Sequence, residues 1–496
     1  MCHLLHVGRP TPRIEGWPSP YDGRVTSNVL AERYASAPVV ELFSTEHKIR
    51  LERRFWIAVM EAQRGLGVDI PAEAIEASRA VVDDVDLEAI AARERITRHD
   101  VKARVEEFAA LAGHEHAHKA MTSRDLTENV ELLQVRTGLE LIRDRLVTVL
   151  ARLAERAVEH DGLALTGRSH NVPAQVTTLG KRFANAGEEV LAAYRRVDAL
   201  ARDLPLRGLK GPMGTAQDQL DLLGGDVDAL DRLEDAVRAH LGFATALTSV
   251  GQVYPRSLDF EVVTALAQSA AGPASLATTL RLMAGLDLAT EGFVAGQVGS
   301  SAMPHKMNAR SCERIVGLKR ILEGHVTMVG SVAGDQWNEG DVSCSVVRRV
   351  ALPDAFYATD GVHQTTLHVL AGFGVFPRVV ADELDRYLPY LATTAMLVAL
   401  VRQGLGREEA HELLKGHAVA AALAARDQGA AAEGLLDRLA GDARIPLDRP
   451  ALDALMADPL AFVGDAHRQV AAFASRVGAL VAEHPDAASY QPDRLL

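Results

Sequence analysis

Residues 126–159 read LTENVELLQVRTGLELIRDRLVTVLARLAERAVE, and this stretch decides the fold. It contains no proline and a single glycine, Gly138, so nothing in it strongly interrupts a helix. Large apolar residues recur along it at helical spacing. They are Leu126, Val130, Leu133, Leu141, Leu146, Leu150 and Leu153. The stretch therefore predicts one long helix with a continuous apolar face, as in a bundle of long helices.

Helical patterns continue on both sides of this stretch. A second long helix is predicted to begin near Pro173 and to run toward Leu204, and others are predicted at 258–271, 273–286, 311–331 and 345–373. Shorter helices precede the bundle, with breaks near 65–67 and at Pro71, and follow it, with breaks at Gly404, Gly406, Gly416 and Gly429. We therefore expect an all-α protein with an N-terminal helical domain (27–121), a central long-helix bundle (122–375) and a C-terminal helical domain (376–496).

The composition excludes several classes of protein. The 496 residues carry a net charge of −13, which argues against a nucleic-acid-binding surface but leaves room for a small basic pocket. Three cysteines are too few for a disulfide framework, so a reducing cytoplasm is expected. No apolar run approaches the roughly 20 residues that a membrane-spanning helix needs. Residues 1–26 contain four prolines and no apolar signal-peptide core, which predicts a disordered extension.

Residues 299–308 read GSSAMPHKMN and contain the most distinctive group of reactive side chains. Ser300, Ser301 and Lys306 bring two hydroxyl groups and a positive charge into one loop, which three glycines precede at 292, 296 and 299. A surface loop that leads into a helix capped by Asn308 is the alternative interpretation. The combination of residues favours a proton acceptor held beside a cation.

Three other segments are predicted to begin helices. They are 97–100 (TRHD), 122–125 (TSRD) and 169–171 (SHN), the last directly before Pro173. The first turn of a helix offers unpaired N–H groups and a positive dipole end, which suit carboxylates and phosphates. Simple helix capping is the alternative for each segment taken alone. A histidine or serine at each of the three favours binding of an anionic ligand.

The loop 299–308 resembles the signature of the fumarase/aspartase superfamily, whose members release fumarate from a substituted succinate; only Ala309, where proline is usual, departs from it. The remaining motifs match one branch in kind and in order. They are 33–36 (RYAS), 98–100 (RHD), His118 before Thr122 and Ser123, Ser169 and His170 through Gln175, Gln252, and Ser345 with Arg348 and Arg349. Together they resemble the adenylosuccinate lyase family from residue 28 onward. The resemblance implies a three-domain fumarase/aspartase-type fold.

It also implies a reaction and a set of residues. The substrates are expected to be adenylosuccinate, which gives AMP and fumarate, and succinylaminoimidazole carboxamide ribotide (SAICAR), with no metal and no organic cofactor. Ser300 would be the general base and His170 the general acid. Lys306, Thr122, Ser123 and Gln252 would hold the succinyl carboxylates, and Arg33, Tyr34, Ser345 and Arg349 the 5′-phosphate. His99, His118 and Arg314 would lie beside the nucleotide, and the other predicted binding residues are Arg98, Asp100, Ser169, Ser301 and Asn308.

One position departs from the family pattern. In the segment 336–341 (QWNEGD) the family commonly has an arginine that helps to bind phosphate, where this chain has Gly340. Either Arg348, Arg349 and Arg33 suffice for the phosphate, or another basic residue substitutes.

Two other functions are alternatives. A sister lyase that acts on a phosphate-free succinate derivative would not need the predicted phosphate residues, and a silent structural member would not need Ser300, His170 and Lys306. Residues 114–118 (HEHAH) also fit the His-Glu-x-x-His pattern of zinc proteases, which requires a helix, although no third ligand follows.

The helix length predicts an oligomer. Thr122 and Ser123 begin the long helix, and His170 follows its far end, on the order of 50 Å away at 1.5 Å per residue. The loop 160–170 is too short to return over that distance. The two ends can serve one reaction only if they come from different chains. The resemblance implies a homotetramer whose active sites are shared among three subunits.

Overall fold

The computed structural model describes residues 28–292, 303, 305–429 and 434–492. Helices account for 69% of the chain, and the expected all-α class is confirmed. The N-terminal part contains α1 (Val29–Arg33), α2 (Ala37–Leu42), α3 (Thr45–Gly65), α4 (Ala72–Ala80), α5 (Leu87–Thr97) and α6 (Asp100–Ala112). The predicted extension at 1–26 lies outside the described residues.

The central part holds the long helices. It contains α7 (Ser123–Glu159), β1 (Ala164–Ser169), β2 (Val172–Thr178), α8 (Leu179–Asp203), α9 (Gln217–Leu222), α10 (Val227–His240), α11 (Ser257–Ser269), α12 (Ala271–Ala284), β3 (Ala289–Thr290), α13 (Arg310–Gly330), α14 (Cys344–Gly372) and β4 (Gly374–Val375). Helices α11 to α14 lie within a few residues of their predicted ranges. The strands β3 and β4 pair antiparallel.

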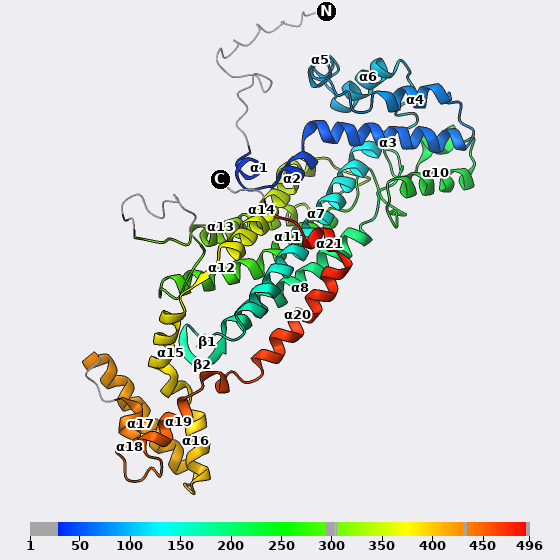
Figure 1. The fold of residues 1–496 in the computed structure, drawn as a ribbon. Helices are drawn as coiled ribbons and strands as arrows, with labels where there is room; N and C mark the ends of the chain where they lie inside the picture. Colours follow the sequence, from blue (N-terminus) through cyan, green and yellow to red (C-terminus); the bar gives the residue numbers. More distant parts are fainter. Residues whose placement is uncertain (1–27, 293–302, 304, 430–433, 493–496) are drawn as a thin grey trace, which may run out of the picture.

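The predicted long helix forms without interruption as α7, 37 residues in length. It runs the length of the bundle and packs against α8, α14 and α20 (Ala466–Glu483) (Figure 1). Leu126, Leu139, Leu146 and Leu150 of its apolar face are fully buried. At Gly138 a Cβ atom would lie 2.7 Å from the ring of Phe356 on α14, so the glycine allows the two helices to approach closely.

The prediction that the second long helix begins near Pro173 is wrong. Residues 164–178 form the antiparallel hairpin β1–β2, and α8 begins only at Leu179, after the cap Thr178. The turn of the hairpin is His170 and Asn171, with φ of 52° and 61°. Two consecutive residues with positive φ are typical of a tight two-residue hairpin turn, and the β-branched residues of β2 favour a strand.

The C-terminal part begins with α15 (Pro377–Leu391). Beyond it lie α16 (Thr393–Arg402), α17 (Arg407–Gln428), α18 (Leu435–Ala440), α19 (Arg449–Met456) and the 3₁₀ turn η2 (Pro459–Phe462), and the last helices are α20 and α21 (Pro485–Ala488). Helix α17 continues through Gly416, so the predicted break there is wrong. None of the described helices is long and apolar enough to cross a membrane.

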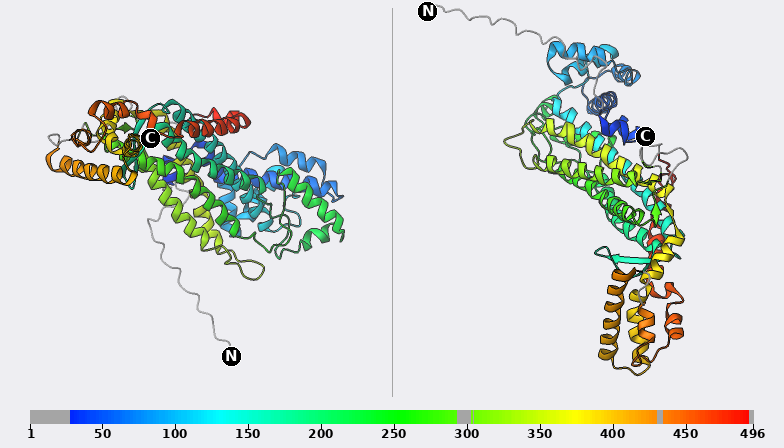
Figure 2. Two further views of the ribbon diagram at one scale, coloured as in Figure 1. Left: turned by 90° about the horizontal axis from the view of Figure 1, so that it is seen from below. Right: turned by 90° about the vertical axis from the view of Figure 1, so that its left-hand side faces the viewer.

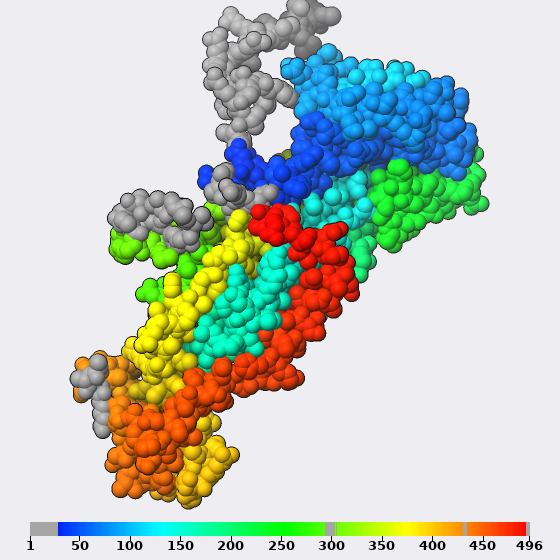
Figure 3. Space-filling view, viewed as in Figure 1, coloured from blue at the N-terminus to red at the C-terminus, as the bar shows by residue number. Residues whose placement is uncertain are grey.

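The molecule is elongated, with the N-terminal helices at one end of the bundle and α16–α19 at the other (Figure 2). Helices α16–α19 bury a separate apolar cluster that includes Met396, Leu400 and Leu435. Helix α20 then returns along the bundle, where Figure 3 shows it on the surface beside α7. Its Phe473 packs in the main core and fits against Gly187 of α8. The first residues of α7 therefore lie toward the N-terminal helices, and its last residues lie toward α16–α19.

Candidate active site

A cavity of about 500 Å³ lies at the start of α7, where α6, α7 and α14 meet. It collects seven of the predicted binding residues from four separate parts of the sequence. They are His99, Asp100, Thr122, Ser123, Gln252, Ser345 and Arg349. Each of four other cavities of the described residues contains at most one of the predicted residues.

The start of α7 is fixed by a buried aspartate. The Asp125 carboxylate accepts from the backbone N–H of Thr122 at 2.9 Å, in the predicted capping-box arrangement. Its other oxygen binds the guanidinium of Arg207 at 2.7 Å and the backbone N–H of Gly211 at 2.9 Å. Arg207 and Asp125 are both fully buried. The position of Thr122 and Ser123 at the cavity is therefore set by interactions beneath them.

His99 begins α6 and faces Ser123. Its Nδ1 accepts from the backbone N–H of Lys102 at 3.1 Å, so within the predicted helix start 97–100 it is His99 that caps α6, while Thr97 ends α5. Because Nδ1 is an acceptor, Nε2 carries the proton of the neutral ring and can donate to Ser123 Oγ at 3.4 Å. Arg98 precedes it in the left-handed conformation and is exposed, outside the cavity lining.

His118 lies between α6 and α7 and is held by a tryptophan. The indole Nε1 of Trp56 donates to His118 Nδ1 at 3.1 Å. Burial lowers the pKa of His118 to about 4. The ring is therefore neutral at pH 7, with its proton on Nε2. Residues 114–118 form no helix, so the geometry that the zinc-protease pattern requires is not present.

Gln252 is positioned by the segment that contains Gly340. Its backbone N–H donates to the carbonyl oxygen of Glu339 at 2.6 Å. Gly340 has φ of 153°, and a Cβ atom there would lie 2.8 Å from Cβ of Gln252. No side chain fits at residue 340 without a shift of Gln252, so the phosphate-binding arginine expected from the resemblance has no place here.

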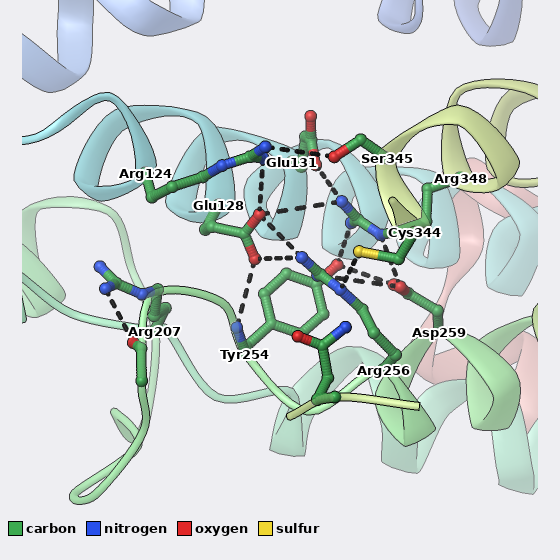
Figure 4. Close-up of polar contacts among 12 residues, drawn as sticks. Arg124, Glu128, Glu131, Arg207, Tyr254, Arg256, Asp259, Cys344, Ser345 and Arg348 are labelled. Carbon is green, nitrogen blue, oxygen red and sulfur yellow. Dashed lines mark hydrogen bonds and ion pairs between the residues drawn. The ribbon is translucent and has the colours of Figure 1, made fainter. Parts of the chain in front are cut away.

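Arg348 is committed to a buried ionic network beneath the cavity (Figure 4). It is 3% exposed, its Nε lies 2.6 Å from Asp259, and its Nη1 lies 2.5 Å from Glu131. Burial alone would lower the pKa of Arg348, but Asp259, Tyr254 and Glu131 raise it well above its usual value. Its guanidinium is thus held by carboxylates of the protein itself, and its part in phosphate binding stays a prediction. The adjacent Arg349 is exposed and lines the cavity.

A second group of predicted residues lies near the start of α13. The guanidinium of Arg314 lies over the ring of Tyr34, 5.5 Å from its centroid, and Arg33 is exposed at the end of α1. The carboxylate of Glu291 accepts from the backbone N–H groups of Ser311 and Cys312, both at 2.9 Å, and so fixes this end of α13. Lys306 is exposed and Asn308 half-buried in the segment before α13, and Ser300 and Ser301 lie outside the described residues.

A third group is the hairpin turn at the far end of α7. Ser169 and His170 are both exposed, and Ser169 lines an open cleft of about 1020 Å³ between the hairpin, α8 and α12. The 37 residues of α7 separate this turn from the cavity by about 55 Å at 1.5 Å per residue. Because His170 lies in the turn of the β1–β2 hairpin, it does not sit at a helix N-terminus, and no helix dipole acts on it there.

The sequence analysis did not predict three of the charged residues that line the cavity: Lys48, Arg124 and Glu131. Lys48 comes from α3, and no sequence pattern connects it with α7. The spacing of Arg124 and Glu128 by four residues was a usable signal, since such pairs lie on one helix face.

Comparisons with known proteins show which family this sequence is similar to. A family model described as Lyase matches residues 38–321, and one described as Adenylosuccinate lyase C-terminus matches residues 389–473. The adenylosuccinate lyase of Saccharomyces cerevisiae is 34% identical over 463 residues, which cover 92% of this chain and 95% of the yeast protein. That of Schistosoma mansoni is also 34% identical, over 90% of this chain and 93% of its own length.

Solved structures of related fold extend the comparison. The 3-carboxy-cis,cis-muconate lactonizing enzyme of Pseudomonas putida has a TM-score of 0.79 at 21% identity, and covers 91% of this chain and 99% of its own. The fumarate lyase of Mesorhizobium sp. BNC1 has a TM-score of 0.76 at 23% identity, and covers 89% and 98%. The fold and the matched family define a lyase of the fumarase/aspartase type. Within that class, the chain belongs to the adenylosuccinate lyase family.

Proposed function

We propose that the protein cleaves adenylosuccinate to AMP and fumarate, and SAICAR to its carboxamide product and fumarate. The observation that carries this proposal is the single cavity that holds Thr122, Ser123 and Gln252 beside Ser345 and Arg349. The first three offer hydroxyl and amide donors to carboxylates, and the last two a hydroxyl and a guanidinium to a phosphate. A phosphate-free sister substrate would leave Arg349 without a ligand.

The proposed reaction is a β-elimination. Ser300 removes a proton from the carbon next to a succinyl carboxylate, so a second negative charge develops on that carboxylate. This charge is stabilised by Lys306, by the hydroxyls at the start of α7 and by Gln252. These groups are already in position when the reaction begins, so they do not have to reorganise. The carbon–nitrogen bond then breaks, and His170 protonates the leaving nitrogen. All groups in this scheme are side chains, so it uses no metal and no organic cofactor.

His118 fits a donor role in this scheme. Because Trp56 occupies Nδ1, only Nε2–H is available to a ligand, and the low pKa keeps the ring uncharged. An uncharged hydrogen-bond donor suits the nucleotide part of the substrate. A protonated histidine at this position would attract the succinyl carboxylates and so compete with Lys306.

We propose that the active enzyme is a homotetramer with active sites shared among three subunits. The three groups of residues lie on separate parts of one chain, and α7 separates Thr122 from His170 by about 55 Å. A second copy of the bundle, antiparallel to the first, would bring the hairpin of one chain to the cavity of another. We place this assembly in the cytoplasm, with which the free, buried Cys312 and Cys344 are compatible.

Two measurements test the proposal. Purified protein is incubated with adenylosuccinate, and AMP formation is followed by ultraviolet absorbance; absence of turnover would refute the function. For the shared site, inactive His118→Ala and His170→Ala proteins are mixed under conditions that exchange subunits. Random mixing should restore about a quarter of the sites. A mixture that exchanges subunits and stays inactive would contradict the shared site.

A further inference from the structure

Arg124 lies in the first turn of α7 and connects two sides of the cavity (Figure 4). Its Nη2 donates to Oγ of Ser345 on α14 at 3.2 Å, and its Nη1 lies 3.2 Å from Glu128. Because the Ser345 hydroxyl accepts this hydrogen bond, its own hydrogen is available to donate to a ligand. Arg124 therefore stands in direct contact with a residue proposed to bind phosphate.

The carboxylates that line the cavity already have cationic partners. Asp100 binds Arg104 at 3.1 Å, and Glu131 binds Lys48 at 3.0 Å and Arg348 through its other oxygen. Burial would raise the pKa of Glu131, but Lys48 and Arg348 hold it well below its usual range. Neither carboxylate therefore needs Arg124 to neutralise its negative charge.

Glu128, beneath Arg124, is shared with a closer partner. It is fully buried, it lies 2.8 Å from Nη2 of Arg256, and it accepts from the backbone N–H of Tyr254 at 3.2 Å. Loss of Arg124 would therefore leave Glu128 paired. The guanidinium of Arg124 is the outermost member of this group and borders the cavity.

The cavity and the network beneath it contain more cations than anions. The cations are Lys48, Arg104, Arg124, Arg256, Arg348 and Arg349, and the carboxylates are Asp100, Glu128, Glu131 and Asp259. One further carboxyl, Glu52, lies fully buried 2.7 Å from Nε of Arg104, and burial raises its pKa. With Glu52 counted as ionised, six cations still face five carboxylates. The surplus suits a dianionic phosphate.

The position of Arg124 is unfavourable for a residue that serves stability alone. The first turn of a helix carries the positive end of the macrodipole, which favours acidic residues and disfavours cations. A neutral residue there is expected to leave the stability of α7 unchanged or slightly higher. An anion bound at the cavity would compensate both the guanidinium and the helix dipole.

We infer that Arg124 is a substrate-binding residue that binds the 5′-phosphate together with Ser345 and Arg349. The inference rests on the proposed function. It identifies Arg124 as the basic residue that takes over the role of the arginine that the family commonly has at position 340. The phosphate is then held by two guanidinium groups and a hydroxyl from α7 and α14.

The test compares two substrates that differ only in the phosphate, adenylosuccinate and succinyladenosine. Arg124→Gln should lower kcat/KM for adenylosuccinate by about 10- to 100-fold, the range of one charge-assisted hydrogen bond. It should leave kcat/KM for succinyladenosine and the melting temperature unchanged. Arg124→Lys should restore part of the loss, because it returns the charge without the planar fork. Arg152→Gln, on the same helix and paired with Glu155 three residues further along, is the control and should behave as wild type.

An equal loss for both substrates, or no loss for either, would overturn the inference. A fall in melting temperature with unchanged substrate discrimination would also overturn it, because Arg124 would then be structural. If Arg124→Gln does not fold, Arg124→Lys decides through the same substrate ratio. Failure of the wild-type protein to cleave adenylosuccinate would instead refute the proposed function, so the two failures are distinguishable.

Discussion

Arg348 and Arg349 are neighbours in the sequence with opposite expected roles, and replacing each with methionine separates the two. Arg348→Met removes the cation between Asp259 and Glu131 in a buried network. Tyr254 still donates to Asp259 at 2.7 Å, and Lys48 still binds Glu131. Each carboxylate therefore loses one partner and keeps another. Breaking a buried pair in this way destabilises by about 3–5 kcal/mol.

With an unfolding entropy of about 2.1 cal/mol/K per residue, a chain of 496 residues loses about 1 °C of melting temperature per kcal/mol, so about 3–5 kcal/mol corresponds to a fall of about 3–5 °C. Arg349→Met alters an exposed side chain and should change stability by no more than about 0.5 kcal/mol. Its effect should be kinetic: KM for adenylosuccinate should rise much more than kcat falls, because the phosphate is remote from the bond that breaks.

The assay is thermal unfolding followed by circular dichroism at one protein concentration, with steady-state kinetics on the same samples. The concentration is fixed because assembly shifts the melting temperature. A stable, kinetically impaired Arg348→Met protein, or an unstable Arg349→Met protein with normal KM, would refute the assignment of the two arginines.

Three further outcomes are expected. Ser300→Ala should lower kcat by at least about 10²-fold, and calorimetry should show that the variant still binds adenylosuccinate. If the variant keeps substantial activity, the general base is the neighbouring Ser301 and not Ser300. Gly340→Ala should lower kcat/KM by about tenfold or more, since its Cβ would displace Gln252; wild-type kinetics would show that the contact relaxes freely. Burial lowers the pKa of His363 to about 3, so its neutral form stabilises the fold above pH 6.5. That stability is lost as pH falls below 6.5, by about 1.4 kcal/mol per unit. His363→Gln should make the fall in melting temperature between pH 6.5 and 5 smaller, and an identical fall would contradict the assignment.

The long helix and the cavity edge could be predicted from local sequence. The leucines of α7 define its apolar face, and Thr122 with Asp125 defines its first turn, because both signals act within a few residues. The hairpin at 164–178 was missed because Pro173 after Ser169 and His170 matches a helix start equally well. What decides the structure there is the pairing of β1 with β2, which is a contact between strands and not a property of either alone.

The roles of Arg348 and Arg349 could not be separated from sequence. Both are arginines of α14, and their difference is the side of the helix that each occupies. Arg348 meets Asp259 from α11 and Glu131 from α7, at separations of 89 and 217 residues. Such long-range partners become visible only once the bundle is assembled.

The length of α7 restricts which changes this chain can accept. Each residue of a helix adds 1.5 Å and turns the chain by about 100°. Deletion of one residue from the middle of α7 would therefore rotate the hairpin relative to Thr122 and Ser123, and place buried leucines in solvent. Deletion of seven residues would keep nearly the same face but bring the ends about 10 Å closer. Loops of this protein can vary in length, whereas α7 can change only if its partner helices in the bundle change by the same number of turns.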